Sequence, residues 1–127
     1  MSSSLQIQRL GQVAVTVRDV PRAVAFYRDA LELPLLFQAG NMAFFAVGGL
    51  RLLLSVPEKP EFDHPASTLY YTVPDIHAAY ELLLERGVEF RGKPHPVGKL
   101  GSAETWMAFC SDPDGNLLAI MSEVPLE

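Results

Sequence analysis

The sequence predicts an α+β fold made of two β-α-β-β-β modules that pair around a concave cleft. Three observations carry this prediction: a strand–helix–strand order that occurs twice, residue matches between the two halves, and a hairpin motif near the C-terminus. One helix can cover only one face of its sheet. We therefore expect the helices outside and the cleft between the sheets, a shape that suits a ligand.

The first module is expected within residues 10–56. Gly11 to Val17 alternates valines with Gln, Ala and Thr, which is the periodicity of a half-buried strand. Asp19 is a suitable helix N-cap, and Pro21 fits a first helical turn that needs no N–H donor. Three further strands are expected at residues 35–38, 42–47 and 50–56.

Residues 57–66 form a polar linker, and the same order restarts in residues 67–123. Thr68 to Val73 suits a strand, Asp75 a helix cap, and Gly87 a helix stop. We expect a short strand at 88–91 and a Pro/Gly-rich loop at 93–102. The hairpin from Trp106 to Met121 supplies the last two strands.

That hairpin turns at Asp112-Pro113-Asp114-Gly115. Proline presets φ at the second turn position, aspartate hydrogen-bonds forward from the first, and glycine tolerates positive φ at the exit. Apolar runs on both sides have the length and composition of strands. A calcium loop would need further ligands, so we interpret this motif as a turn.

Residue matches link the two halves. Residues 16–20 correspond to 72–76, residues 42–44 to 107–109, and residues 52–55 to 119–122. Three matches in the same order favour a duplicated module over two independently similar units.

Strand alternation assigns residues to the two faces of each sheet, and a shift of one residue would invert any one strand. The residues expected on the cleft face are Gln12, Ala14, Thr16, Leu52, Leu54, Thr68, Tyr70, Thr72, Ala119 and Met121. The valines, Leu53, Leu69, Tyr71 and Ile120 are expected beneath the helices.

The bulk composition excludes several classes of protein. The 127 residues, 49% of them hydrophobic, suffice for a single domain, 1–127, with its own core. The 10 Lys and Arg against 15 Asp and Glu, without a basic run, argue against nucleic-acid binding. We expect no membrane span and no signal peptide, and the lone Cys110 agrees with a cytoplasmic location.

Two stretches carry a resemblance to a known family. Residues 12–20 with Ala25-Phe26-Tyr27-Arg28-Asp29, and Phe109-Cys-Ser-Asp-Pro-Asp-Gly-Asn116, resemble the vicinal oxygen chelate superfamily. It includes glyoxalase I, fosfomycin and bleomycin resistance proteins, methylmalonyl-CoA epimerase and extradiol dioxygenases. The resemblance implies paired modules around a cleft, usually in a homodimer, but no single reaction.

In that superfamily a divalent metal is usually held by the first and last strand of each module. The matching positions are Gln12, Leu52, Thr68 and Ala119, where the metal enzymes carry His, Gln or Glu. Two of the four have no donor atom, whereas a catalytic site needs about three good ligands. We therefore expect no metal, and no divalent-metal cofactor. His64, His77 and His95 share no metal-ligand spacing and offer no substitute.

Other polar and aromatic residues are candidates for contact with a ligand. Tyr70 is expected in the cleft beside Gln12, and Phe109 and Trp106 are possible aromatic walls, although core packing also explains such residues. His95 and Lys99, in the loop with Lys93 before Glu104, can meet an anionic group, or this loop is simply solvated. The expected ligand-binding residues are Gln12, Thr68, Tyr70, His95, Lys99, Trp106, Phe109 and Ala119; catalytic residues are unknown.

Three functions stay open. The first is a homodimeric binding protein for a small apolar or aromatic, possibly anionic, molecule. The second is an enzyme of the superfamily's type, similar to lactoylglutathione lyase, an isomerase or a dioxygenase, acting on a small oxygenated substrate or, without metal, through Tyr70, His95 or Glu104. The third is a structural or regulatory domain with a vestigial cleft.

Overall fold

The computed structural model describes residues 5–126, and it contains two separate four-stranded sheets. The first sheet has the strand order β1-β4-β3-β2 and the second β5-β8-β7-β6, which confirms the α+β class. In each sheet the first and last strands of the module pair in parallel, and the other pairs are antiparallel. The strands are β1 (Gln12–Thr16), β2 (Leu35–Ala39), β3 (Met42–Val47), β4 (Leu50–Ser55), β5 (Leu69–Thr72), β6 (His95–Leu100), β7 (Ala103–Ser111) and β8 (Leu117–Pro125).

Each module has one main helix that begins at a capping aspartate. Asp19 caps α1 (Val20–Val24), which continues as a π-helical segment, η1 (Ala25–Ala30). Asp75 caps α2 (Ile76–Glu85) by accepting hydrogen bonds from two backbone N–H groups at 3.1 Å. A short 3₁₀ turn, η2 (Pro60–Phe62), lies in the connection between the modules.

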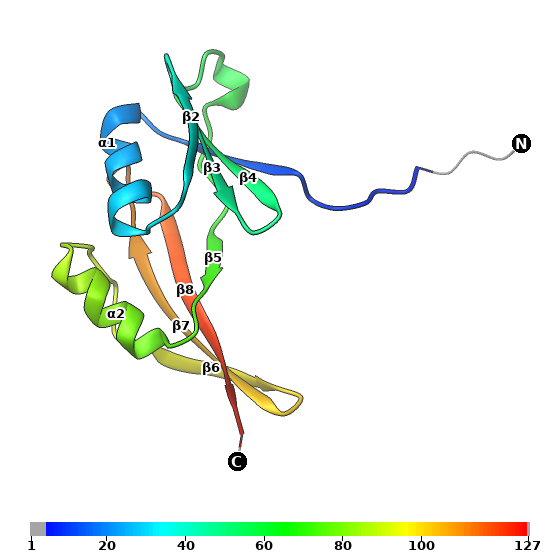
Figure 1. Cartoon of the computed structure of the whole chain (residues 1–127), viewed down its shortest axis with the longest axis vertical. Coiled ribbons are helices and arrows are strands. Elements are labelled where there is room, and N and C mark those ends of the chain that lie inside the picture. The colour runs from blue at the N-terminus through cyan, green and yellow to red at the C-terminus, as the bar shows by residue number, and fades with distance from the viewer. Residues whose placement is uncertain (1–4, 127) are drawn as a thin grey trace, which may run out of the picture.

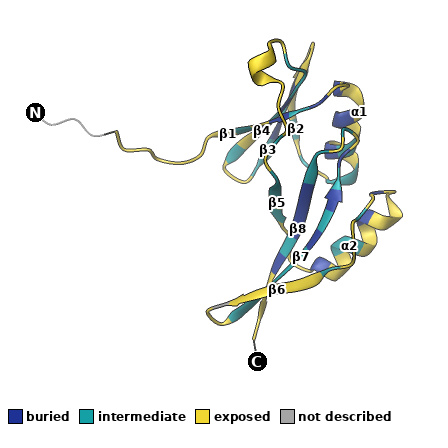
Figure 2. Ribbon diagram, turned by 180° about the vertical axis from the view of Figure 1, so that it is seen from behind, coloured by how far each residue is buried: buried dark blue, intermediate teal, exposed yellow. Residues whose placement is uncertain are grey.

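Both helices lie on the same side of the molecule (Figure 1). The buried residues gather between each helix and its sheet, and they form two clusters that share the neighbours Phe26 and Leu31 (Figure 2). The face of each sheet that turns away from the helices is more exposed, and we call it the open face. Residues 5–10 form an N-terminal arm that extends away from the sheets (Figure 1).

The register of β4 corrects the faces expected for that strand. Val13 pairs with Leu52 and Val15 with Leu54, and both leucines are buried, at 1% and 0% exposure. They therefore lie beneath the helix, and the intervening Leu53 lies on the open face. In β8 the expected faces are as observed, because Ala119 pairs with the outward Tyr70.

The loop expected at residues 93–102 is instead strand β6, paired with β7. The strand expected at 88–91 is reduced to an isolated bridge between Phe90 and Cys110. The β-α-β-β-β order of the second module is therefore kept, with its second strand later in the chain than expected.

The two modules are joined by polar contacts at the β7–β8 turn. The Tyr27 hydroxyl in η1 donates a buried hydrogen bond to Asp112 Oδ2 at 2.8 Å. Asn116 Nδ2 donates to the backbone oxygen of Thr16 at 2.9 Å, so the turn also holds the end of β1. Asp114 accepts from Arg22 at 3.2 Å at the edge of the same junction.

We expect Tyr27→Phe to lower the free energy of unfolding by roughly 1–2 kcal/mol, because it removes one donor from a buried carboxylate. The measurement is urea unfolding followed by circular dichroism. Tyr80→Phe is the matched control, since the Tyr80 ring packs on Phe90 and its hydroxyl makes no hydrogen bond within residues 5–126. Equal stability of the two variants would contradict a structural role for the Tyr27 hydroxyl.

Candidate functional site

An aromatic row crosses the open face of the second sheet. Tyr70 on β5 and Phe109 on β7 both pair with Ala119 on the intervening β8. Their rings meet edge to face, with centroids 6.0 Å apart. Ala119 between them is completely buried, while Tyr70 remains 49% exposed. The small alanine thus leaves room for two aromatic rings to close over it.

His95 on β6 extends this row. Its ring centroid lies 6.5 Å from that of Phe109, and its Nδ1 lies 3.1 Å from the backbone oxygen of Lys93. The structure therefore brings together four of the residues expected to contact a ligand: Tyr70, His95, Phe109 and Ala119.

Trp106 and Lys99 do not belong to this group. Trp106 lies on the helix side of β7, with its ring 5.2 Å from that of His77 and its Nε1 donating to Glu104 Oε1 at 3.1 Å. Lys99 pairs with Glu104 and shares that side. A register shift between Pro96 and Gly98 explains this, because the shift moves Lys99 to the face opposite His95.

The open face of the first sheet has its own aromatic and cationic residues. Arg51 lies beside Gln12 in the β1–β4 register, and its guanidinium carbon lies 5.8 Å from the centre of the Phe44 ring. Phe37 packs beside Phe44 with centroids 6.4 Å apart. A hollow of about 640 Å³ is lined by Arg9, Gly11, Gln12, Gly49 and Arg51.

Arg51 was not predicted as a site residue, although the sequence contains a signal for it. It is the one charged residue in a run of leucines, and a charge in such a run marks the solvated face of the strand. No ion pair within residues 5–126 involves Arg51, so no neighbouring carboxylate neutralises its charge there.

The four positions that correspond to the family's metal ligands can now be placed by register. Phe44 pairs with Leu53 just as Phe109 pairs with Ala119. The position on β4 that corresponds to Ala119 is therefore Leu53 and not Leu52. The set is therefore an amide at Gln12, a hydroxyl at Thr68 and two aliphatic side chains. Within residues 5–126 there is also no group of three His, Cys, Asp or Glu side chains placed to hold a metal ion. These donors do not fit a divalent metal.

Cys110 is not a candidate nucleophile. It is completely buried beneath α2, and burial, followed by the nearby Asp112 carboxylate, raises the pKa of its thiol to about 12. The thiol is therefore protonated near neutral pH, whereas a nucleophilic cysteine acts as the thiolate.

The family model of the Glyoxalase/Bleomycin resistance protein/Dioxygenase superfamily matches residues 9–120. The chain belongs to this superfamily. The protein YraH of Bacillus subtilis is 33% identical over 126 residues, covering 88% of this chain and 96% of its own length. Metallothiol transferase FosB of Staphylococcus saprophyticus is 32% identical over 76 residues, covering 60% of this chain and 46% of that protein.

Solved structures show the same fold. A superfamily member from Sphaerobacter thermophilus has a TM-score of 0.77 at 25% identity, covering 94% of this chain and 100% of that chain. TnmS3, an antibiotic binding protein from Streptomyces sp. CB03234, has a TM-score of 0.74 at 25% identity, covering 94% of this chain and 99% of that chain. None of the helices within residues 5–126 has the length and apolar character required to cross a membrane.

Proposed function

We propose that this protein binds a small aromatic or apolar molecule carrying an anionic group on its open faces, without a divalent metal. The observation that carries the proposal is the row formed by Tyr70, Ala119 and Phe109. This half-exposed, edge-to-face aromatic pair offers apolar ring surface against which the ring of a ligand can pack. A bound ligand would remove that apolar surface from water.

The anionic group of the ligand is assigned to the first sheet. Arg51 has no carboxylate partner in the described part of the chain and lies beside the Gln12 amide. A guanidinium with free N–H groups binds carboxylates and sulfonates in a bidentate manner, and the amide can donate a further hydrogen bond. His95 supplies a second polar group next to the aromatic row.

The donor atoms support function without metal. Gln12, Thr68, Leu53 and Ala119 together provide one amide oxygen and one hydroxyl, fewer than the about three strong ligands of a catalytic divalent site. Binding that relies on aromatic stacking and one cation does not need such an ion. The name of TnmS3, an antibiotic binding protein, agrees with a binding role for this fold.

A homodimer would complete the binding cleft, because the two aromatic surfaces lie on separate sheets of one chain. Large apolar side chains are exposed on the N-terminal arm and on β2: Leu5 is 85% exposed, Ile7 81% and Phe37 57%. A second copy that covers these residues would remove apolar surface from water and appose the open faces of two chains.

Binding is tested with 1-anilinonaphthalene-8-sulfonate, an aromatic anion that becomes fluorescent when it binds. We expect Tyr70→Ala and Phe109→Ala each to weaken its binding about tenfold, since each removes a stacking surface. Arg51→Gln should weaken it and reduce its salt dependence. Leu84→Ala is the control, because Leu84 is exposed on α2, on the other side of the second sheet from its open face. Unchanged binding in all three site variants would refute the proposed site.

Metal analysis of the purified protein, followed by turnover assays with glutathione hemithioacetal and catechols, distinguishes an enzyme from a metal-free binding protein. We expect less than one equivalent of divalent metal per chain and no metal-dependent turnover. One tightly bound metal per chain, with turnover that is lost on chelation, would overturn the metal-free binding function.

Sedimentation equilibrium tests the dimer. We expect a mass of two chains, and we expect Leu5→Ser combined with Ile7→Ser to weaken association, because these side chains lose apolar contact area. A monomer at all measured concentrations would contradict the homodimer.

A further inference from the structure

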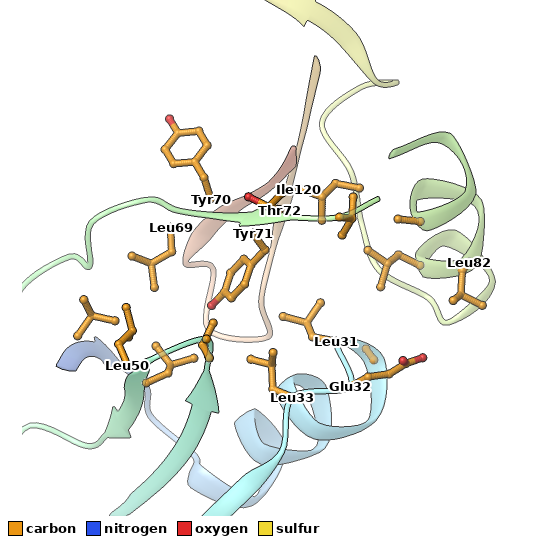
Figure 3. A pocket seen from close by; sticks show the side chains of 18 of the residues that line it. Leu31, Glu32, Leu33, Leu50, Leu69, Tyr70, Tyr71, Thr72, Leu82 and Ile120 are labelled. Carbon is orange, nitrogen blue, oxygen red and sulfur yellow. The ribbon is translucent and has the colours of Figure 1, made fainter. Parts of the chain in front are cut away.

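A second cavity lies between the two modules on the side that faces the helices. It has a volume of about 620 Å³, which is in the range of small-molecule sites. Tyr70 lines its edge but points away from it in Figure 3, so this cavity is distinct from the open face that carries the aromatic row. Apart from Tyr70, none of the residues proposed to bind a ligand on the open faces lines it.

The wall of this inter-module pocket is mostly aliphatic. It combines the strand residues that alternate toward the helices with the chain that leaves η1, so both modules contribute. Its aliphatic side chains include Leu31, Leu33, Leu52, Leu69 and Ile120. An apolar molecule that enters replaces exposed aliphatic surface with contacts.

Tyr71 supplies one polar group directed into the pocket. It pairs with Ile120 in the β5–β8 register, and its ring extends between the modules toward Leu33 and Leu50 (Figure 3). No hydrogen bond within residues 5–126 uses its hydroxyl, and burial raises the pKa of this phenol above its ordinary value. The hydroxyl therefore remains a donor at the cavity wall, where it can donate to an acceptor on a ligand.

The charges at the rim cancel each other. Arg86 contacts Glu32 Oε2 at 2.6 Å and donates from its other terminal nitrogen to the backbone oxygen of Ala30 at 2.7 Å. Glu32 has φ of 61°, a left-handed conformation that is uncommon for a residue with a side chain, directly after the end of η1. With both charges engaged, the rim offers no free cation for an anionic ligand.

We propose that the inter-module pocket binds a neutral, largely apolar small molecule whose carbonyl or ether oxygen accepts a hydrogen bond from Tyr71. This site lies on the opposite side of β5 and β8 from the aromatic row and is independent of the function proposed above. Its ligand differs in class, because the open face has an unpaired cation at Arg51 and this pocket has none.

The N-terminal arm is the competing occupant. Leu10 already lines the pocket, Arg9 donates to the backbone oxygen of Gly49 at 2.7 Å, and Leu5 and Ile7 are exposed beyond it. The extended path of the arm away from the sheets favours a free pocket (Figure 1). Dye binding to variants of the pocket and of the arm distinguishes a free pocket from one filled by the arm.

The probe is Nile red, a neutral dye with a carbonyl oxygen, titrated against the full chain. We expect saturable binding of one dye per chain. Leu69→Trp, which fills the pocket, should weaken binding at least about tenfold, and Tyr71→Phe should weaken it roughly threefold to tenfold by removing only the hydroxyl. Leu36→Trp is the matched control, since Leu36 is 55% exposed on β2 and lies outside the pocket lining.

Each result decides the proposal. The proposal would be overturned if Tyr71→Phe and Leu69→Trp both bound the dye with full affinity. If the tryptophan variant failed to fold, full affinity in Tyr71→Phe alone would overturn it. Loss of dye binding in Phe109→Ala would place the dye on the open face, and a marked gain in Leu5→Ser/Ile7→Ser would show that the arm fills the pocket; either outcome refutes a free inter-module site. Retained dye binding in Phe109→Ala, together with loss of the anionic probe, would separate this site from the open face.

Discussion

The buried Asp112 carboxylate is the interaction on which the arrangement of the two modules depends. Its Oδ1 accepts from the backbone N–H groups of Asp114 and Asn116 at 2.9 Å, which shapes the β7–β8 turn. Its Oδ2 accepts from the Tyr27 hydroxyl of the other module at 2.8 Å. A buried charge is costly unless donors replace its water. The turn supplies its own backbone donors, whereas the Tyr27 hydroxyl reaches the carboxylate only when η1 is docked on the turn. The same docking sets the walls of the inter-module pocket.

The sequence was sufficient for the features that depend on local chemistry. The capping residues Asp19 and Asp75, the Asp112–Gly115 turn and the module order follow from short-range preferences, and the structure confirms them. The face of β4 was predicted wrongly because a run of leucines has no strong alternation; only Arg51 marks its solvated side. Strand β6 was missed because its Pro and Gly residues lower strand propensity, and pairing with β7 outweighs that preference.

The same reasoning explains which site residues could be predicted. Tyr70 and Ala119 lie on strands whose alternation was correct, so their meeting with Phe109 was accessible from the sequence. Trp106 does not join the aromatic row because it lies three residues from Phe109 on β7, and residues an odd number apart on a strand face opposite sides. Lys99 does not join it because a bulge in β6 reverses the face of the residues that follow it. The inter-module pocket had no sequence signal at all, since its wall forms only when residues of two modules pack together.

Adjacent residues on β5 connect the two proposed sites. Tyr70 is directed to the open face and Tyr71 to the pocket, and both orientations are fixed by pairing with Ala119 and Ile120 on β8. Because the side-chain period of a strand is two, a shift of β5 by one residue would exchange these tyrosines and disrupt both surfaces at once. Ser122, whose hydroxyl donates to the backbone oxygen of Val73 at 2.7 Å, opposes such a shift at the end of β5. The register of this short parallel pair is thus the constraint that keeps an aromatic surface and an aliphatic pocket on opposite sides of one sheet.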